Sequence, residues 1–165
     1  MNFLFSLNEE RQFMKHSFTL FQEEIEKNKL TILSNCEKNR IILEHYDLLN
    51  DIYFFIITEF QPKKNEIYQK NLINDTYLIY FLKMINQRMN QVLSYYKQKK
   101  YHEINYYIND IIFLFENQHL LNYISKKPYV YQIYHYYALS IYIGYLLTNH
   151  EHYLDLVLSC MIEFS

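Results

Sequence analysis

The sequence contains very few of the residues that form tight turns. Its 165 residues include one glycine, Gly144, and two prolines, Pro62 and Pro128. All-β and α/β folds use such residues repeatedly where the chain reverses direction. The scarcity therefore excludes these classes and predicts an all-α fold.

Cysteine is also scarce. Cys36 and Cys160 stand far apart in the sequence and form no Cys-x-x-Cys motif, so reduced and buried thiols are expected. The first ten residues contain only a short apolar run without a basic lead-in, which is not typical of a signal peptide. Both features predict a cytoplasmic protein.

Positive charge shows no excess, because the formal net charge is −2. Short basic clusters occur at Lys63–Lys64, Lys97–Lys100 and Lys126–Lys127. Each lies where a helix is expected to end, and cations there complement the helix dipole. Contact with nucleic acid is the alternative interpretation of these clusters, but direct nucleic-acid binding is not expected.

Charged residues are missing altogether between Pro128 and His150. This stretch is long enough to cross a bilayer. It also carries seven tyrosines and several amide and hydroxyl side chains, which are costly in hydrocarbon. The prediction is a helix over 129–147 that lies at the centre of a helical stack and spans no membrane.

Apolar residues are plentiful, at half of the composition, and they recur at helical spacing. The clearest pattern predicts a helix over 75–97, with an apolar stripe at Leu78, Leu82, Ile85, Met89, Val92 and Tyr96. A tight turn is expected at 98–101. Residues 1–165 are thus expected to form a single domain of seven or eight helices in stacked antiparallel hairpins, either a degenerate tetratricopeptide-like solenoid or a helical bundle.

Helix ends are predicted from capping residues. Ser6 and Glu9 have the spacing of a capping box for the first helix. Asn149 is a suitable N-cap for the last helix.

Residues that could carry catalysis are few. Arg40 and His45 have the Arg-x4-His spacing of HEPN ribonucleases, in which the arginine holds phosphate and the histidine transfers a proton. Ile41 stands where that family usually has a polar residue, and the motif occurs early in the chain. A surface arginine and histidine near a helix end are the alternative. No enzyme is predicted.

A metal site is a second possibility, at His150, His152 and Cys160. Residues two apart on a helix point about 200° away from each other, so the two histidines converge only if His150 lies in a loop. Capping and surface exposure explain them without a metal. No metal and no cofactor are predicted.

Polar residues on predicted helix faces form a candidate peptide-binding groove. Lys83, Asn86 and Asn90 form a stripe opposite the apolar face of the 75–97 helix, and carboxamides there can clamp a peptide backbone. A second group shares one face of the uncharged helix: Tyr131, His135 and Tyr142. The alternatives are an exposed face for the first group and a core position for the second.

The chain from about 28 to 147 resembles the C-terminal helical-repeat domain of the Rgg/GadR/MutR peptide-responsive regulators. The segments that carry the resemblance are Thr31–Cys36, the helix with Gln87-Arg-Met-Asn-Gln-Val-Leu93, the turn Lys99-Lys-Tyr-His-Glu-Ile104, the helix with Ile108, Ile111 and Phe115, and the helix Val130–Tyr145. The resemblance implies a degenerate tetratricopeptide-like stack that dimerises and holds short peptides. It places Asn90 at a position where those proteins tend to carry a helix asparagine. No DNA-binding domain is expected before residue 28.

The predicted function is recognition of a peptide or protein partner in regulation, without catalysis. A total of 31 Phe and Tyr, 12 and 19 respectively, is more than one small core accommodates, so exposed aromatic side chains and a homodimer or hetero-complex are expected. One alternative is a small inhibitor or accessory subunit of a mobile element. Another is a ribonuclease that uses Arg40 and His45.

Overall fold

The computed structural model describes residues 16, 19–27, 34–59, 70–117, 122 and 130–164. Within this part the chain forms six helices and no strand. The all-α prediction is confirmed, while the predicted number of seven or eight helices is slightly too high. The capping box expected at Ser6 and Glu9 lies outside the described residues.

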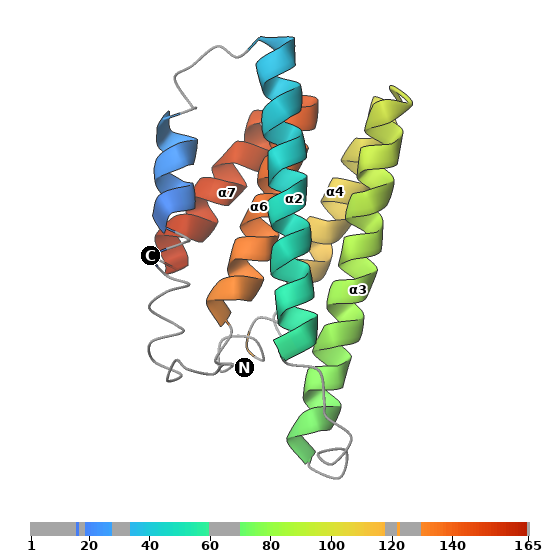
Figure 1. Ribbon diagram of the computed structural model, residues 1–165, viewed down its shortest axis with the longest axis vertical. Coiled ribbons are helices and arrows are strands. Elements are labelled where there is room, and N and C mark those ends of the chain that lie inside the picture. Colours follow the sequence, from blue (N-terminus) through green and yellow to red (C-terminus); the bar gives the residue numbers. More distant parts are fainter. Residues whose placement is uncertain are drawn as a thin grey trace.

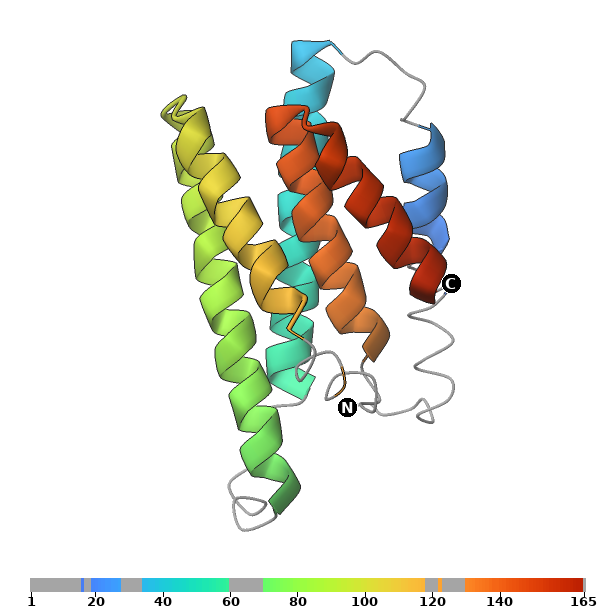
Figure 2. The same ribbon diagram turned by 180° about the vertical axis from the view of Figure 1, so that it is seen from behind.

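The helices run alternately up and down along the long axis of the molecule (Figures 1 and 2). A short helix at 19–27 precedes α2 (Asn35–Glu59) and α3 (Lys70–Lys97), which lie at the front of Figure 1. Behind them lie α4 (Tyr101–Phe115), α6 (Val130–Thr148) and α7 (Glu151–Phe164).

Helix α6 is the centre of the fold, because it packs against α2, α4 and α7. Every side chain from Gln132 to Leu147 is buried except that of Tyr145, which is half-buried. A helix that is apolar on all sides needs partners on all sides. The predicted burial of 129–147 is confirmed for these side chains. No helix in the described part has the length and apolarity needed to cross a membrane.

The packing of α2 against α6 decides between the two predicted architectures. In a solenoid each unit contacts only its neighbours in the chain. Here α2 packs against α6 although α3 and α4 lie between them in sequence. The described helices therefore close around α6 as a bundle, and a tetratricopeptide-like solenoid is not confirmed.

The apolar spacing explains which face of each helix turns inward. On α2, five side chains at alternating spacings of four and three are buried: Ile42, Tyr46, Leu49, Tyr53 and Ile56. Gly144 of α6 allows Ile108 of α4 to approach closely, because a Cβ at Gly144 would lie 3.0 Å from two Ile108 side-chain carbons. Arg88 of α3 donates to Asp110 of α4 at 2.7 Å and joins these two helices.

The predicted turn between α3 and α4 is confirmed. Lys99 has a φ of 60°, and its N–H donates to the Tyr96 carbonyl at 3.0 Å. The Lys100 N–H donates to the Tyr95 carbonyl at 2.9 Å. These two bonds form a Schellman motif, which satisfies the last carbonyls of α3 from the backbone alone.

The predicted role of Asn149 as the N-cap of the last helix is wrong. Helix α7 begins at Glu151, so His150 directly precedes it. Asn149 instead follows α6 with a φ of 60°, and its N–H donates to the Tyr145 carbonyl at 2.7 Å. Asparagine tolerates this left-handed conformation better than most residues and therefore ends α6.

The two cysteines have different environments. Both are free thiols, and Cys160 is buried as predicted. The prediction of a buried thiol is wrong for Cys36, which is exposed in the first turn of α2. It lies before the apolar stripe of that helix begins, so no neighbouring helix covers it.

Candidate functional site

The predicted polar stripe on α3 is divided between the core and the surface. Asn86 is buried, and its Oδ1 accepts a hydrogen bond of 3.0 Å from the Tyr136 hydroxyl of α6. Lys83 and Asn90 are exposed, and Lys83 lies 5.6 Å from the ring centre of Tyr80. Asn86 therefore joins two helices and is closed to a ligand in this structure.

The second predicted group belongs to a buried aromatic cluster. His135 and Tyr142 of α6 are both buried, with the Phe21 ring centre 5.1 Å from His135 and 5.8 Å from Tyr142. His45 of α2 completes the cluster, 5.4 Å from Tyr142. The side chain of Tyr131 lies outside the described residues.

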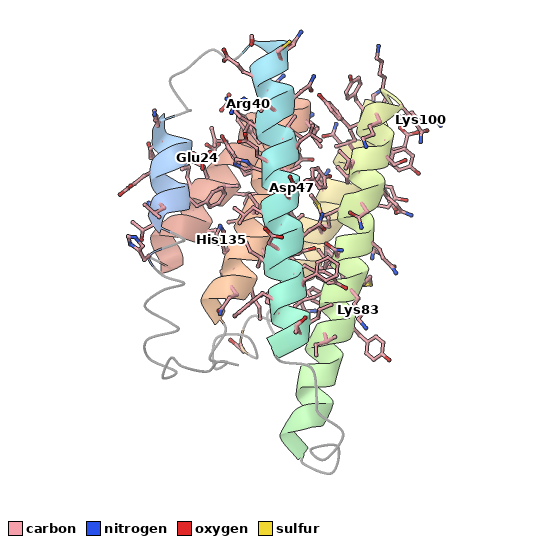
Figure 3. The ribbon with its side chains drawn as sticks, viewed as in Figure 1. Glu24, Arg40, Asp47, Lys83, Lys100 and His135 are labelled. Atoms are coloured by element: carbon pink, nitrogen blue, oxygen red, sulfur yellow. The ribbon has the colours of Figure 1, made fainter. Side chains whose placement is uncertain are left out.

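The six predicted residues are thus not gathered around an open groove. Figure 3 shows His135 and Lys83 on opposite sides of α2, with His135 towards helix 19–27 and Lys83 on α3.

The two buried histidines influence each other. Burial, reinforced by repulsion from the neighbouring His45, lowers the pKa of His135 to about 4. Burial also lowers the pKa of His45, while Glu24, whose Oε1 lies 3.9 Å from His45 Nε2, opposes that shift. Both imidazoles are therefore neutral near neutral pH.

The ribonuclease pair is not assembled. Arg40 is exposed and forms an ion pair of 3.1 Å with Glu44 one turn later on α2. His45 faces the core. Residues five apart on a helix point about 140° away from each other, so the two side chains leave α2 in different directions.

The proposed metal ligands do not converge either. His150 and His152 are exposed and contact the ring of Tyr153, whereas Cys160 is buried. In the described part of the chain, no three His, Cys, Asp or Glu side chains are placed to hold a metal ion.

A cleft that was not predicted lies between α2, α3 and the start of α4. It has a volume of about 360 Å³. Eight residues line this α2–α3 cleft: Asn39, Ile42, Leu43, Leu93, Tyr96, Lys97, Lys99 and Tyr101. Ile42 is buried and Leu93 is half-buried, so they form its apolar floor, whereas the exposed Lys97, Lys99 and Tyr101 form its rim.

The shape of the bundle creates this cleft. Helices α2 and α3 lie close together at their lower ends in Figure 1 and diverge upwards. One hydrogen bond crosses the opening, because the Tyr96 hydroxyl donates to Asn39 Oδ1. The Tyr96 ring meets Tyr101 edge-on at 6.4 Å. Burial raises the pKa of Tyr96, and Tyr101 adds to the shift, so Tyr96 remains a neutral donor.

A local signal for the cleft was present in the sequence. The cluster Lys97–Lys100 is flanked by Tyr96 and Tyr101, but the lysines were interpreted as helix caps. Aromatic residues directly beside cations are a common feature of ligand sites. That pattern points to this end of the bundle, although not to α2 as the opposite wall.

Comparison of the chain with protein-family models, with curated protein sequences and with solved structures found no match.

Proposed function

We propose that this protein is a non-enzymatic binding module of the cytoplasm that recognises a peptide or protein partner, and that the α2–α3 cleft is its recognition site. The observation that carries the proposal is the cleft itself. Its volume of about 360 Å³ lies within the range of small-ligand sites, and its lining combines an apolar floor with a few polar groups.

The chemistry of the lining favours a peptide. Leu43 is 52% exposed at the cleft although it is a large aliphatic residue. An apolar side chain of a partner would cover it and reach Ile42 and Leu93 below. Tyr96 and Asn39 offer hydrogen-bonding groups for a peptide backbone at the edge.

The resemblance to peptide-responsive regulators supports the same class of function, but it predicts different residues. Asn90 does not line the cleft, so the proposal moves the site from the predicted groove to the end of the α3–α4 hairpin.

A random peptide library displayed on phage tests this function. The library is selected on the purified protein and recovered peptides are measured by isothermal titration calorimetry. The test variant is Leu43→Arg, which places a charge in the cleft. The control is Leu48→Arg on the same helix, because Leu48 is 38% exposed and does not line the cleft.

We expect recovered peptides to bind the wild type and Leu48→Arg equally and to lose binding to Leu43→Arg. Both leucines are partly exposed, so neither variant should unfold the bundle. The proposal fails if no peptide is enriched, or if Leu43→Arg binds recovered peptides as well as the wild type does.

Partnership with a protein, as in a dimer, an inhibitor or an accessory subunit, is supported by a second observation. Large aromatic side chains are exposed on three helices: Phe54, Tyr80, Tyr106 and Phe113. Such residues are enriched at interfaces. Light scattering of the wild type and of Phe113→Ser tests whether α4 mediates self-association, since Phe113 is 76% exposed.

The ribonuclease alternative has less support, because Arg40 and His45 face different directions. Incubation with mixed RNA, beside an Arg40→Ala variant, separates the two classes. If the wild type cleaves RNA and Arg40→Ala does not, an enzymatic function replaces the binding proposal.

A further inference from the structure

The rim of the α2–α3 cleft carries positive charge without a counter-charge. Lys97 and Lys99 line it, and none of the eight lining residues is a carboxylate. Within the described residues, neither lysine forms an ion pair, since the ion pairs there involve Arg40, His45 and Arg88. An unbalanced pair of cations beside an apolar floor favours an anionic group on whatever fills the cleft.

Three carbonyls near the end of α3 accept backbone hydrogen bonds and do not need the lysine ammonium groups. The Tyr95 and Tyr96 carbonyls already accept hydrogen bonds from the backbone N–H groups of Lys100 and Lys99. The Ser94 carbonyl accepts one of 3.1 Å from the Gln98 N–H. The Lys97 and Lys99 ammonium groups are therefore not required as partners of these three carbonyls.

The end of α3 and the start of α4 meet at the cleft. Helix α4 begins at Tyr101, inside the cleft, and no side chain of Lys100 caps it. The positive end of its dipole lies beside the negative end of α3, which finishes at Lys97, so the two dipole ends offset each other and the two lysines set the charge at the rim. Figure 3 places Lys100 at the same end of the molecule. The nearest carboxylate of α4, Glu103, is exposed and does not line the cleft.

The surrounding surface limits how far an anion can extend. Glu44, Asp47 and Asp51 are exposed on α2 after its last cleft residue, Leu43, and Figure 3 shows Asp47 partway along that helix. A long polyanion such as RNA would meet these carboxylates, whereas a short segment with one or two negative groups would not.

We propose that the α2–α3 cleft selects acidic peptides, in which an apolar side chain enters the floor and an adjacent carboxylate lies against Lys97 and Lys99. This inference rests on the proposed peptide-binding function and adds the class of ligand. The carboxylate belongs to an aspartate, a glutamate or the C-terminus of the peptide, since all three present the same group.

Fluorescence polarisation with matched probes tests the inference. The first probe is a labelled peptide of alternating glutamate with leucine and phenylalanine. The second replaces each glutamate with glutamine, and the third replaces each with lysine. Each peptide is made with a free and with an amidated C-terminus, and labelled oligouridine serves as the nucleic-acid probe.

The matched variants are Lys97→Gln and Lys83→Gln. Both change one exposed lysine of α3, but only Lys97 lines the cleft. We expect the acidic probe to bind several-fold more tightly than the neutral one at low salt, with a smaller difference at high salt. Lys97→Gln should reduce the affinity for the acidic probe by about threefold, as expected for one exposed charge pair. Lys83→Gln should leave that affinity unchanged.

Comparison of the probes with free and amidated C-termini identifies which carboxylate of the peptide binds the lysines. If amidation abolishes binding, the C-terminal carboxylate is the group that contacts the lysines. If amidation has no effect, the side-chain carboxylates are. Either result supports the inference.

Other outcomes overturn it. Equal affinity for the acidic and neutral probes, with binding still lost in Leu43→Arg, refutes the ligand class and leaves the peptide-binding function intact. Tighter binding of oligouridine, with the same dependence on Lys97, replaces the peptide by single-stranded nucleic acid. If neither the probes nor any selected peptide binds, the proposed function itself is refuted.

Discussion

Acidification should destabilise the bundle through His135, which lies buried between α6, α2 and helix 19–27. Its pKa in the folded protein is about 4, lowered first by burial and then by repulsion from His45. In the unfolded chain the same group has its ordinary value of 6.5. The unfolded state therefore binds a proton more readily than the folded state over this range.

The sign and size of the effect follow from linkage. The contribution of a neutral, buried His135 is fully present above pH 6.5 and is lost as the pH falls through 6.5 towards 4. A lowering of this size corresponds to about 3 kcal/mol of unfolding free energy at most. The pKa of His45 is lowered as well and adds to the loss, while Glu24 and Glu44 oppose that second shift. Phe21 and Tyr142, the other rings of the cluster, carry no charge at these pH values.

Urea denaturation at a series of pH values between 7 and 4 measures the effect, with the wild type beside His135→Phe. The variant keeps an aromatic ring in the cluster but removes the titrating group. We expect the unfolding free energy of the wild type to fall steeply over this range and that of His135→Phe to fall clearly less. A control variant, His102→Gln on the exposed face of α4, should follow the wild-type curve. Equal slopes for the wild type and His135→Phe would refute the reasoning.

Three further substitutions test the packing. Gly144→Ala should lower the free energy of unfolding by about 1 kcal/mol in chemical denaturation. The new Cβ would meet Ile108 at 3.0 Å, and the cost of overpacking exceeds the gain in helix propensity. Adding Ile108→Val to this variant should restore part of the loss. Tyr46→Phe should cost about 1 kcal/mol by the same assay, since it removes a buried hydrogen bond of 2.7 Å to the Met89 carbonyl; an unchanged midpoint would contradict this. Lys99→Gly should raise the thermal midpoint slightly, because glycine adopts a φ of 60° without strain, and a lower midpoint would count against the Schellman turn.

The helices could be predicted from the sequence because their signals are local. The stripe at Leu82, Ile85, Met89 and Val92 predicted the inward face of α3, and all four are fully buried. The uncharged stretch predicted the central helix for the same reason, since only a helix enclosed by others lacks a polar face.

The site could not be predicted because it depends on distances between helices. Helical spacing placed Asn86 and Asn90 on one face of α3, but α6 covers Asn86 through Tyr136 and leaves Asn90 exposed. The α2–α3 cleft exists because these two helices diverge, and no spacing within either helix encodes that angle. His45 and His135 also stand far apart in sequence, so their proximity is a property of the bundle.

The central position of α6 has a consequence for synthesis on the ribosome. Helix α2 emerges well before α6, and the part of its buried face that packs on α6 must wait until α3 and α4 have been made. At ordinary translation rates the interval lasts on the order of several seconds. During it, His45 and Tyr53 of α2 lack the α6 rings that they contact in the finished bundle, which are those of Tyr142 and Tyr136. We therefore expect the nascent chain to bind chaperones, and its yield to depend on how quickly the ribosome passes through the segment that encodes α6.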